Sequence, residues 1–302
     1  MKAIMSAICN QMALMPPPMK RFIGVVLLTM ASIFSASTIA AGDPVRPLRI
    51  GLTPTFPSDQ YRPLEKWRLY MEHKLQRPVE FIRRDRYIET MDLLRLKKLD
   101  FAWVCDHPYV YFKKWLRLLA VPVYKGRPYY QSYLIVPAAD KATVSLAQLK
   151  DKVFAYTDPY SNTGYLAVRL QLQRAGEDPA RYFRKTFFVW SHRRVLEAVA
   201  TGLADGGAVS SHVWDTLSID QPKLTSALRV VAKSSDYGFA PFVARASVDD
   251  EDFQAMQKLL LGMTADDDGR ALLKELNLDG FIAGDPRLYK STERLIRALG
   301  ER

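Results

Sequence analysis

Cysteine is nearly absent from this chain of 302 residues, which has only Cys9 and Cys105. Cys9 lies in an N-terminal segment that we expect to be removed, so Cys105 would remain as the single cysteine of the mature protein. A disulfide within the mature chain is then excluded, and the apolar core must hold the fold unaided.

Sequence motifs of metal, nucleotide and hydrolase sites are missing as well. The four histidines lack the spacing of metal ligands, and no His-Glu-x-x-His, Gly-x-Ser-x-Gly or Gly-rich phosphate-loop motif occurs. Cys105-Asp106-His107 places a thiol beside an imidazole, but close neighbours in sequence seldom face each other productively. We therefore expect a binding protein without cofactor or metal, with catalysis as the weakest alternative.

Long apolar runs occur only near the N-terminus. Lys20-Arg21 precede the apolar stretch Phe22–Phe34, and small residues follow up to Ala41. This order is typical of a cleavable signal peptide, here residues 1–41 with Met19 as the expected initiator, although an uncleaved anchor is the alternative. No cysteine follows the apolar stretch, so a lipid anchor is not expected. The sequence predicts export to the periplasm.

Positive charge exceeds negative charge by eleven over the full sequence. Three of these cations, Lys2, Lys20 and Arg21, lie in the presequence, which leaves a mature charge of +8, eleven less three. The surplus favours anionic ligands in general. It is spread along the chain, and export argues against a nucleic-acid partner.

Strand and helix patterns alternate along the mature chain. This alternation predicts an α/β fold of two lobes, each a mostly parallel sheet flanked by helices, with two crossing strands as a hinge and a ligand cleft between the lobes. Lobe 1 is expected at 46–130 and again at 241–302, which ends in a helical tail, and lobe 2 at 131–240. Strands are expected at 48–52, 79–82, 100–104, 127–136, 153–156, 186–190, 206–209, 228–232 and 239–244, and helices at 64–75, 87–96, 108–116, 164–176, 193–201, from 211 and from 252 onward.

Residues 154–165 are the most informative segment. An apolar strand pattern stops at Asp158-Pro159, and Ser161, Asn162 and Thr163 then open a helical pattern. Such a turn offers hydroxyls, free backbone N–H groups and the positive end of a helix dipole, all of which favour an anion. The alternative is an ordinary helix N-cap, for which the same residue types are suited.

Two further strand-to-helix turns repeat this pattern, Ser191-His192 and Ser210-Ser211-His212. Capping again is the alternative, but His192 could donate a ring N–H to an oxyanion. Because all three turns should follow parallel strands of one sheet, we expect them at one sheet edge, where ligands of open α/β folds bind.

Tyrosines at the ends of predicted elements could form the opposite wall of the cleft. Tyr87, Tyr130 and Tyr237 can each pack a ring and still present a hydroxyl, although each could be a half-buried packing residue. Trp103 and Trp190 are expected in the core.

Together these segments resemble the phosphate/phosphite/phosphonate substrate-binding proteins of bacterial ABC transporters. The resemblance covers residues 48–289 and is most specific at 158–165, at Ser191-His192 with 202–208, at 100–104, and at Tyr130-x-Ser132. It implies a type II periplasmic binding protein, whose two lobes close over a ligand.

The resemblance also implies roles for individual residues. Ser161, Asn162 and Thr163 match the turn that holds the phosphonate oxygens, while Tyr87, Tyr130 and His192 match further contacts. Members that bind aminoalkylphosphonates clamp the ammonium group with carboxylates. Here the corresponding places hold Ser210, Ser211, His212 and Ala240 instead, so a ligand without a cation is favoured.

The sequence thus predicts a monomeric periplasmic protein that captures a phosphonate, phosphite or phosphate for an ABC transporter. Closure would bring Tyr87 and Thr53 of the first lobe onto an oxyanion held by the second. Two alternatives remain: another small anion, such as a sulfonate or carboxylate, or a sensor that reports to a membrane signalling protein.

Overall fold

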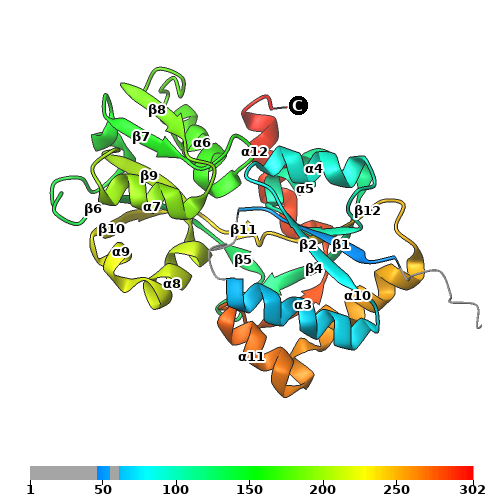
Figure 1. Cartoon of the computed structure of the whole chain (residues 1–302). Coiled ribbons are helices and arrows are strands. Elements are labelled where there is room, and N and C mark those ends of the chain that lie inside the picture. Colours follow the sequence, from blue (N-terminus) through cyan, green and yellow to red (C-terminus); the bar gives the residue numbers. More distant parts are fainter. Residues whose placement is uncertain (1–45, 55–60, 302) are drawn as a thin grey trace, which may run out of the picture. The chain divides into compact units, whose positions relative to one another are not determined.

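Two β-sheets flanked by helices make up the part of the protein that can be described (Figure 1). The computed structural model describes residues 46–54 and 61–301, so the expected signal peptide lies outside the described residues. Within those ranges, no helix has the length and apolar character needed to cross a membrane.

The first sheet has six strands and is mixed. Strand β1 pairs in parallel with β2 and β3, whereas β12 pairs antiparallel with β3 and β4, and β13 pairs antiparallel with β4. Its strand order is β13 (Gly280–Ala283), β4 (Leu116–Val123), β12 (Phe242–Arg245), β3 (Phe101–Trp103), β1 (Leu48–Leu52) and β2 (Val79–Arg83). The helices that accompany it are α3 (Tyr61–Leu75), α4 (Tyr87–Arg95), α5 (Asp106–Phe112), α10 (Asp250–Gly262), α11 (Asp267–Glu275) and α12 (Lys290–Ala298).

The second sheet has five strands, all taken from the middle of the sequence. Strand β7 pairs in parallel with both β8 and β9, and β6 pairs antiparallel with β9 and β10. The order is β10 (Leu228–Lys233), β6 (Ser132–Pro137), β9 (Gly206–Ser210), β7 (Val153–Tyr156) and β8 (Lys185–Phe188). Helices α6 (Ala167–Arg174), α7 (His192–Ala200), α8 (Ser211–Asp220) and α9 (Pro222–Ser226) accompany this sheet.

Two short strands lie on the chain segments that connect the sheets. Strand β5 (Tyr129–Tyr130) pairs antiparallel with β11 (Tyr237–Gly238), with Tyr130 opposite Tyr237. The α/β fold class is therefore confirmed, with the two crossing strands paired to each other.

The sequence prediction was wrong in two details of the sheets. Antiparallel strand pairs outnumber parallel ones, because strands that leave and re-enter a sheet run against the βαβ units. Strands β4 and β13 were also missed. The segment 116–123 contains Pro122, a residue that argues against a strand, and the four residues of β13 fall inside a region with a helical pattern.

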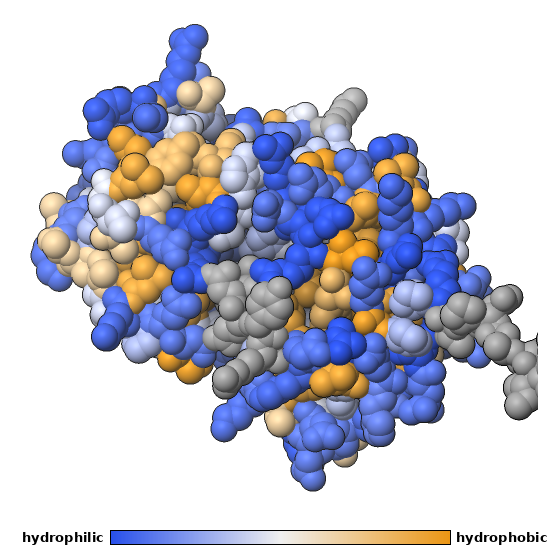
Figure 2. Space-filling model, in the orientation of Figure 1, coloured by the Kyte–Doolittle hydropathy of each residue, from blue (hydrophilic) through white to orange (hydrophobic). Residues whose placement is uncertain are grey.

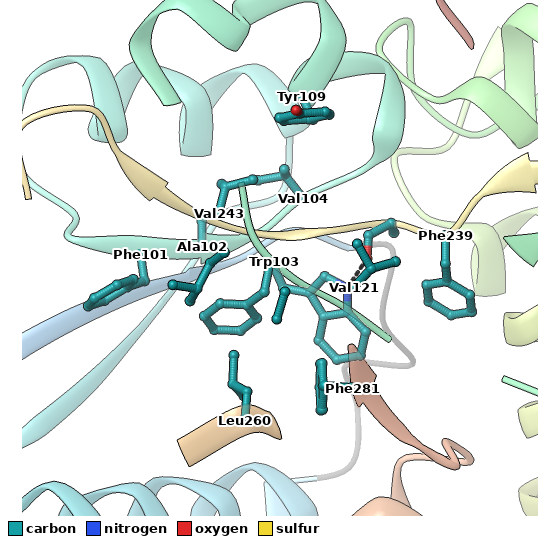
Figure 3. Packing of buried hydrophobic residues seen from close by; sticks show 14 of the residues in the cluster. Phe101, Ala102, Trp103, Val104, Tyr109, Val121, Phe239, Val243, Leu260 and Phe281 are labelled. Atoms are coloured by element: carbon teal, nitrogen blue, oxygen red, sulfur yellow. Dashed lines mark hydrogen bonds between the residues drawn. The ribbon is translucent and has the colours of Figure 1, made fainter. Parts of the chain in front are cut away.

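The core of the six-stranded sheet is rich in aromatic rings. Trp103 is 3% exposed, lies with its ring centroid 6.4 Å from that of Phe281, and donates its indole N–H to the Ala240 carbonyl at 2.8 Å (Figure 3). Its expected core position is confirmed. On the face shown in Figure 2, apolar residues form small patches separated by polar and charged ones.

Candidate functional site

The three hydroxyl-bearing turns lie at one edge of the five-stranded sheet. Strands β7, β8 and β9 are adjacent and parallel, so their carboxyl ends, which carry Thr157, Trp190 and Ser210, point the same way. This arrangement confirms the predicted convergence of the turns. Each turn leads directly into a helix.

The first turn buries its polar side chains completely. The Ser161 hydroxyl accepts the backbone N–H of Gly164 at 3.0 Å, which makes it the N-cap of a π-helix (Asn162–Leu166) that continues into α6. The capping alternative is therefore correct for Ser161. Asn162 and Thr163 are fully buried, yet Asn162 Oδ1 and Thr163 Oγ1 have no hydrogen-bond partner among the described residues.

The hydrogen bonds of His192 define its tautomer. Its Nδ1 accepts the backbone N–H of Ser210 at 3.1 Å, with Thr157 Oγ1 at 3.2 Å, so in the neutral ring the proton is on Nε2. Burial, helped by the neighbouring His212, lowers the pKa of His192 to about 3. The ring is thus a neutral N–H donor at physiological pH. The Ser191 hydroxyl caps α7 by accepting the Arg194 N–H at 3.2 Å.

Hydrogen bonds to other segments of the chain stabilise the third turn. Ser211 Oγ accepts the backbone N–H of Gln131 at 3.0 Å, and His212 Nε2 donates to the Leu276 carbonyl at 3.0 Å. Burial lowers the pKa of His212 to about 4, so this ring is also neutral. Ser132 donates its hydroxyl to the Thr163 carbonyl at 2.5 Å, which supports the first turn from β6.

Tyr87 of the first sheet region reaches across to the first turn, whereas Thr53 hydrogen-bonds within its own sheet. The backbone N–H of Tyr87, at the start of α4, donates to Asp158 Oδ2 at 3.1 Å, whereas the buried Tyr87 hydroxyl makes no hydrogen bond to a described residue. Burial raises the pKa of Tyr87 well above its ordinary value, and the nearby Ser161 hydroxyl opposes that rise. Thr53 Oγ1 donates to the Trp103 carbonyl at 3.0 Å.

Some of the predicted site residues line a small enclosed cavity of about 10 Å³. A volume of this size holds about one water molecule. Trp103, Tyr130, His192, Ser210, His212, Phe239 and Ala240 line it. The other predicted residues are buried but do not line it: Thr53, Tyr87, Ser132, Ser161, Asn162, Thr163, Ser211 and Tyr237.

A larger cavity of about 200 Å³ lies beside the second turn and was not predicted. It combines Thr53 with basic residues of both sheets: Arg83 at the end of β2, Arg84 after it, and Arg193 and Arg194 in the first turn of α7. The acidic Asp85 and Glu197 also line it. The prediction that Trp190 lies in the core was wrong, because the residue is only partly buried and lines this cavity, with a left-handed backbone conformation at φ of 66°. In the sequence, the adjacent pairs Arg83-Arg84 and Arg193-Arg194 were the feature that could have predicted this cavity.

Asp106 is the other residue that sequence reasoning missed as a member of this site. Its carboxylate is fully buried and accepts hydrogen bonds at 2.6 Å from Tyr130, Asn162 and Thr292. The sequence had drawn attention to Cys105-Asp106-His107 only as a possible catalytic cluster. No group of metal-ligating side chains occurs in the described ranges.

A family model described as the periplasmic substrate-binding protein of phosphonate ABC transporters matches residues 50–289. The chain belongs to this family. A curated relative, the probable phosphite-binding protein PhnD1 of Prochlorococcus marinus (strain MIT 9301), is 26% identical over 163 residues, which cover 52% of this chain. The chain matches about half (54%) of that relative's length.

Two solved structures have the same fold. The PhnD1 protein of P. marinus in complex with methylphosphonate has a TM-score of 0.76 at 21% identity, over 84% of this chain and 98% of that one. A binding component of a phosphonate ABC transporter from Pseudomonas aeruginosa has a TM-score of 0.77 at 24% identity, over 83% and 85% of the two chains. At these identities the likeness concerns the fold alone.

Replacing Gly164 by alanine should damage the first turn. A Cβ there would lie 2.1 Å from Thr157 Oγ1, the hydroxyl that lies 3.2 Å from His192 Nδ1, so the clash must displace the turn. We expect a loss of about 2 kcal/mol in the free energy of unfolding, measured by urea titration. A stability within 0.5 kcal/mol of wild type, roughly the scatter of neutral surface substitutions, would contradict this account.

The buried histidines should make the protein less stable in mild acid. Burial lowers the pKa of His107 to about 4, and the Tyr160 backbone opposes this shift. Below a pKa of about 6.5 the unfolded histidine gains a proton that the folded one excludes, so stability falls as the pH drops toward 4. Each such histidine contributes at most about 1.4 kcal/mol per pH unit.

The variant His107→Phe keeps a ring in place of the imidazole that stacks on Tyr160 with ring centroids 5.6 Å apart. Its stability should depend less on pH between 6.5 and 4 than that of wild type, as measured by thermal unfolding. Burial raises the pKa of Asp106 and Asp158, so their protonation in acid favours the folded state and opposes the effect of the histidines. The test is therefore the difference in pH dependence between the variant and wild type. Equal pH dependence of stability in the variant and in wild type would refute the lowered pKa of His107.

Proposed function

We propose that this protein captures a small phosphorus oxyanion between its two sheets and delivers it to an ABC transporter. One observation carries the proposal: Tyr87 Oη, Asn162 Oδ1 and Thr163 Oγ1 are buried without partners among the described residues. Buried polar groups are otherwise almost always hydrogen-bonded, so three such atoms around one sheet edge point to a missing polar ligand. Family membership agrees with this reading.

The proposed site binds an anion with neutral donors. The Tyr87 and Thr163 hydroxyls and the Nε2–H of His192 would each donate to the oxyanion. Hydrogen bonds to a charged acceptor are about twice as strong as neutral ones, and the exclusion of water strengthens them further. The first helical turn after Ser161 adds the positive end of its dipole.

Binding requires the two sheets to separate. The cavity of about 10 Å³ holds about one water molecule, so we expect an oxyanion to enter through an opened cleft. Closure then brings Tyr87 from the first sheet against the turn 161–163 of the second. Only the closed form makes both sets of hydrogen bonds, which is why the ligand favours it.

The residues that line the small cavity limit which substituent the phosphorus atom of the ligand can carry. Trp103, Phe239 and Ala240 give it apolar walls, and His212 is neutral. No carboxylate lines it, so an ammonium group would find no counter-charge there. Phosphite or methylphosphonate therefore fits this protein better than an aminoalkylphosphonate, and the P. marinus relative was solved with methylphosphonate.

The arginine-lined cavity beside the site gives the ligand an electrostatic approach. Its four arginines outnumber its two acidic residues, Asp85 and Glu197, and the positive excess would raise the local concentration of anions by attraction at a distance. Together with the expected signal peptide at 1–41, this arrangement suits a protein that collects dilute anions in the periplasm for a membrane permease.

Isothermal titration calorimetry of the mature protein tests the proposal directly. Methylphosphonate, phosphite and phosphate should be compared with 2-aminoethylphosphonate and with an uncharged solute. We expect saturable 1:1 binding of at least one of the first three and weaker binding of the aminophosphonate. Failure of all oxyanions to bind would refute the proposed function.

Two isosteric substitutions separate binding from folding. Thr163→Val and Tyr87→Phe each remove only a hydroxyl that has no partner among the described residues, so stability should not fall. Each hydrogen bond to a charged ligand contributes about 1.5–3 kcal/mol, so affinity should drop about 10- to 100-fold. Calorimetry measures the affinity and thermal unfolding the stability.

Tyr156→Phe is the matched control for these variants. The Tyr156 hydroxyl is also buried without a described partner, but its ring packs among Phe154, Phe183 and Phe188 in the core of the five-stranded sheet. This variant should bind like wild type. If it lost affinity as strongly as Tyr87→Phe, the unpartnered hydroxyls would not mark the ligand site.

A further inference from the structure

The Asp106 carboxylate is buried in a ring of neutral donors. Oδ1 accepts hydrogen bonds from Tyr130 at 2.6 Å and from the Cys105 thiol at 3.1 Å, while Oδ2 accepts from Asn162 and Thr292, both at 2.6 Å. Four donors fill the acceptor positions of a carboxylate. Among the described residues, the main influences on its pKa are burial and these four neutral donors, Thr292, Tyr130, Cys105 and Asn162.

This carboxylate determines which end of the Asn162 amide faces the proposed site. An ionised carboxylate only accepts hydrogen bonds, so Asn162 must turn its NH₂ group toward Asp106. The carbonyl Oδ1 is then directed elsewhere, and it is the atom that is buried without a described partner. Asn162 therefore presents an acceptor in a turn where the other side chains can donate.

An acceptor among donors changes which anions can bind. A fully deprotonated oxyanion would place a negative oxygen against Asn162 Oδ1, leaving the carbonyl unpaired and repelled. An oxyanion that retains one proton can donate its P–OH to Oδ1 and accept from Tyr87, Thr163 and His192 with its other oxygens. Sulfonates carry no such proton at neutral pH.

We propose that the Asp106–Asn162 pair makes this protein select singly protonated phosphorus oxyanions over sulfonates. The inference rests on the proposed function, because it assigns the ligand head to the turn 161–163. It makes Asp106 a positioning residue that acts through Asn162, and it disfavours the sulfonate alternative that the sequence left open.

The groups around Asp106 stay neutral through the pH range of the test. Facing it are Cys105, Tyr87, Tyr130, Tyr237 and Tyr289, and burial raises the pKa of every one of them. Burial also raises the pKa of Asp106 itself, opposed by its four hydrogen bonds. The hydroxyls and the thiol that face Asp106 therefore keep their protons between pH 6 and 9.

The experiment compares methylphosphonate with methanesulfonate, which differ in the ability to carry a proton. Calorimetry of the full mature chain between pH 6 and 9 should give an affinity for methylphosphonate about 100-fold or more above that for methanesulfonate. The methylphosphonate Kd should rise about tenfold per pH unit above the second pKa of the ligand.

Asp106→Asn tests the pair itself. An asparagine at 106 can donate to Asn162 Oδ1, so Asn162 is free to turn its NH₂ into the site. We expect the preference over methanesulfonate to shrink at least tenfold and the pH dependence to flatten. Asn162→Ser should have the same effect, since a hydroxyl can donate or accept, and it carries the test if Asp106→Asn does not fold.

Thr292→Val is the control, because it removes another donor to Asp106 Oδ2 and leaves the bond to Asn162 in place. Its selectivity and pH dependence should match wild type. Equal wild-type affinities for the two ligands, or a Kd that is constant across the second ionisation of methylphosphonate, would overturn the inference while the proposed function stands. If no oxyanion binds at all, both are overturned.

Discussion

The hydrogen bond from Asn162 Nδ2 to Asp106 Oδ2 joins the two halves of the protein at the place where a ligand would sit. Asp106 begins α5, beside the six-stranded sheet, and Asn162 begins the π-helix after β7 of the five-stranded sheet. A second carboxylate bond, from Tyr87 N–H to Asp158, crosses in the opposite direction. Each half thus places its own carboxylate at the start of a helix of the other half.

The second constraint on this site is that its buried histidine rings are uncharged. His107, His192 and His212 are all buried, and burial lowers the pKa of each to about 3 or 4. A cationic ring would attract any anion, whereas a neutral one discriminates by the direction of its N–H. In the proposed function, the arginines of the neighbouring cavity attract anions from a distance, so attraction and discrimination would be performed by different residues.

The sequence was sufficient to predict the parts of the site that depend on local order. Ser161, Ser191 and Ser210 each follow a strand and precede a helix, and parallel pairing of β7, β8 and β9 brings them to one edge. The Asp106–Asn162 contact joins residues 56 positions apart and depends on how two separate sheets approach each other. Hydrophobic periodicity carries no information on that approach, so Asp106 was noticed only as a neighbour of Cys105 and His107.

The burial of Cys105 protects its thiol from oxidation and from disulfide exchange. Its thiol is 1% exposed, and burial together with the adjacent Asp106 raises its pKa well above the usual value. Thiolate is the form that attacks disulfides and that oxidants modify, and here it is scarce as well as shielded. In an oxidising compartment such a thiol would escape sulfenic acid formation and mixed disulfides with other proteins, so the native fold can keep one cysteine there without a partner.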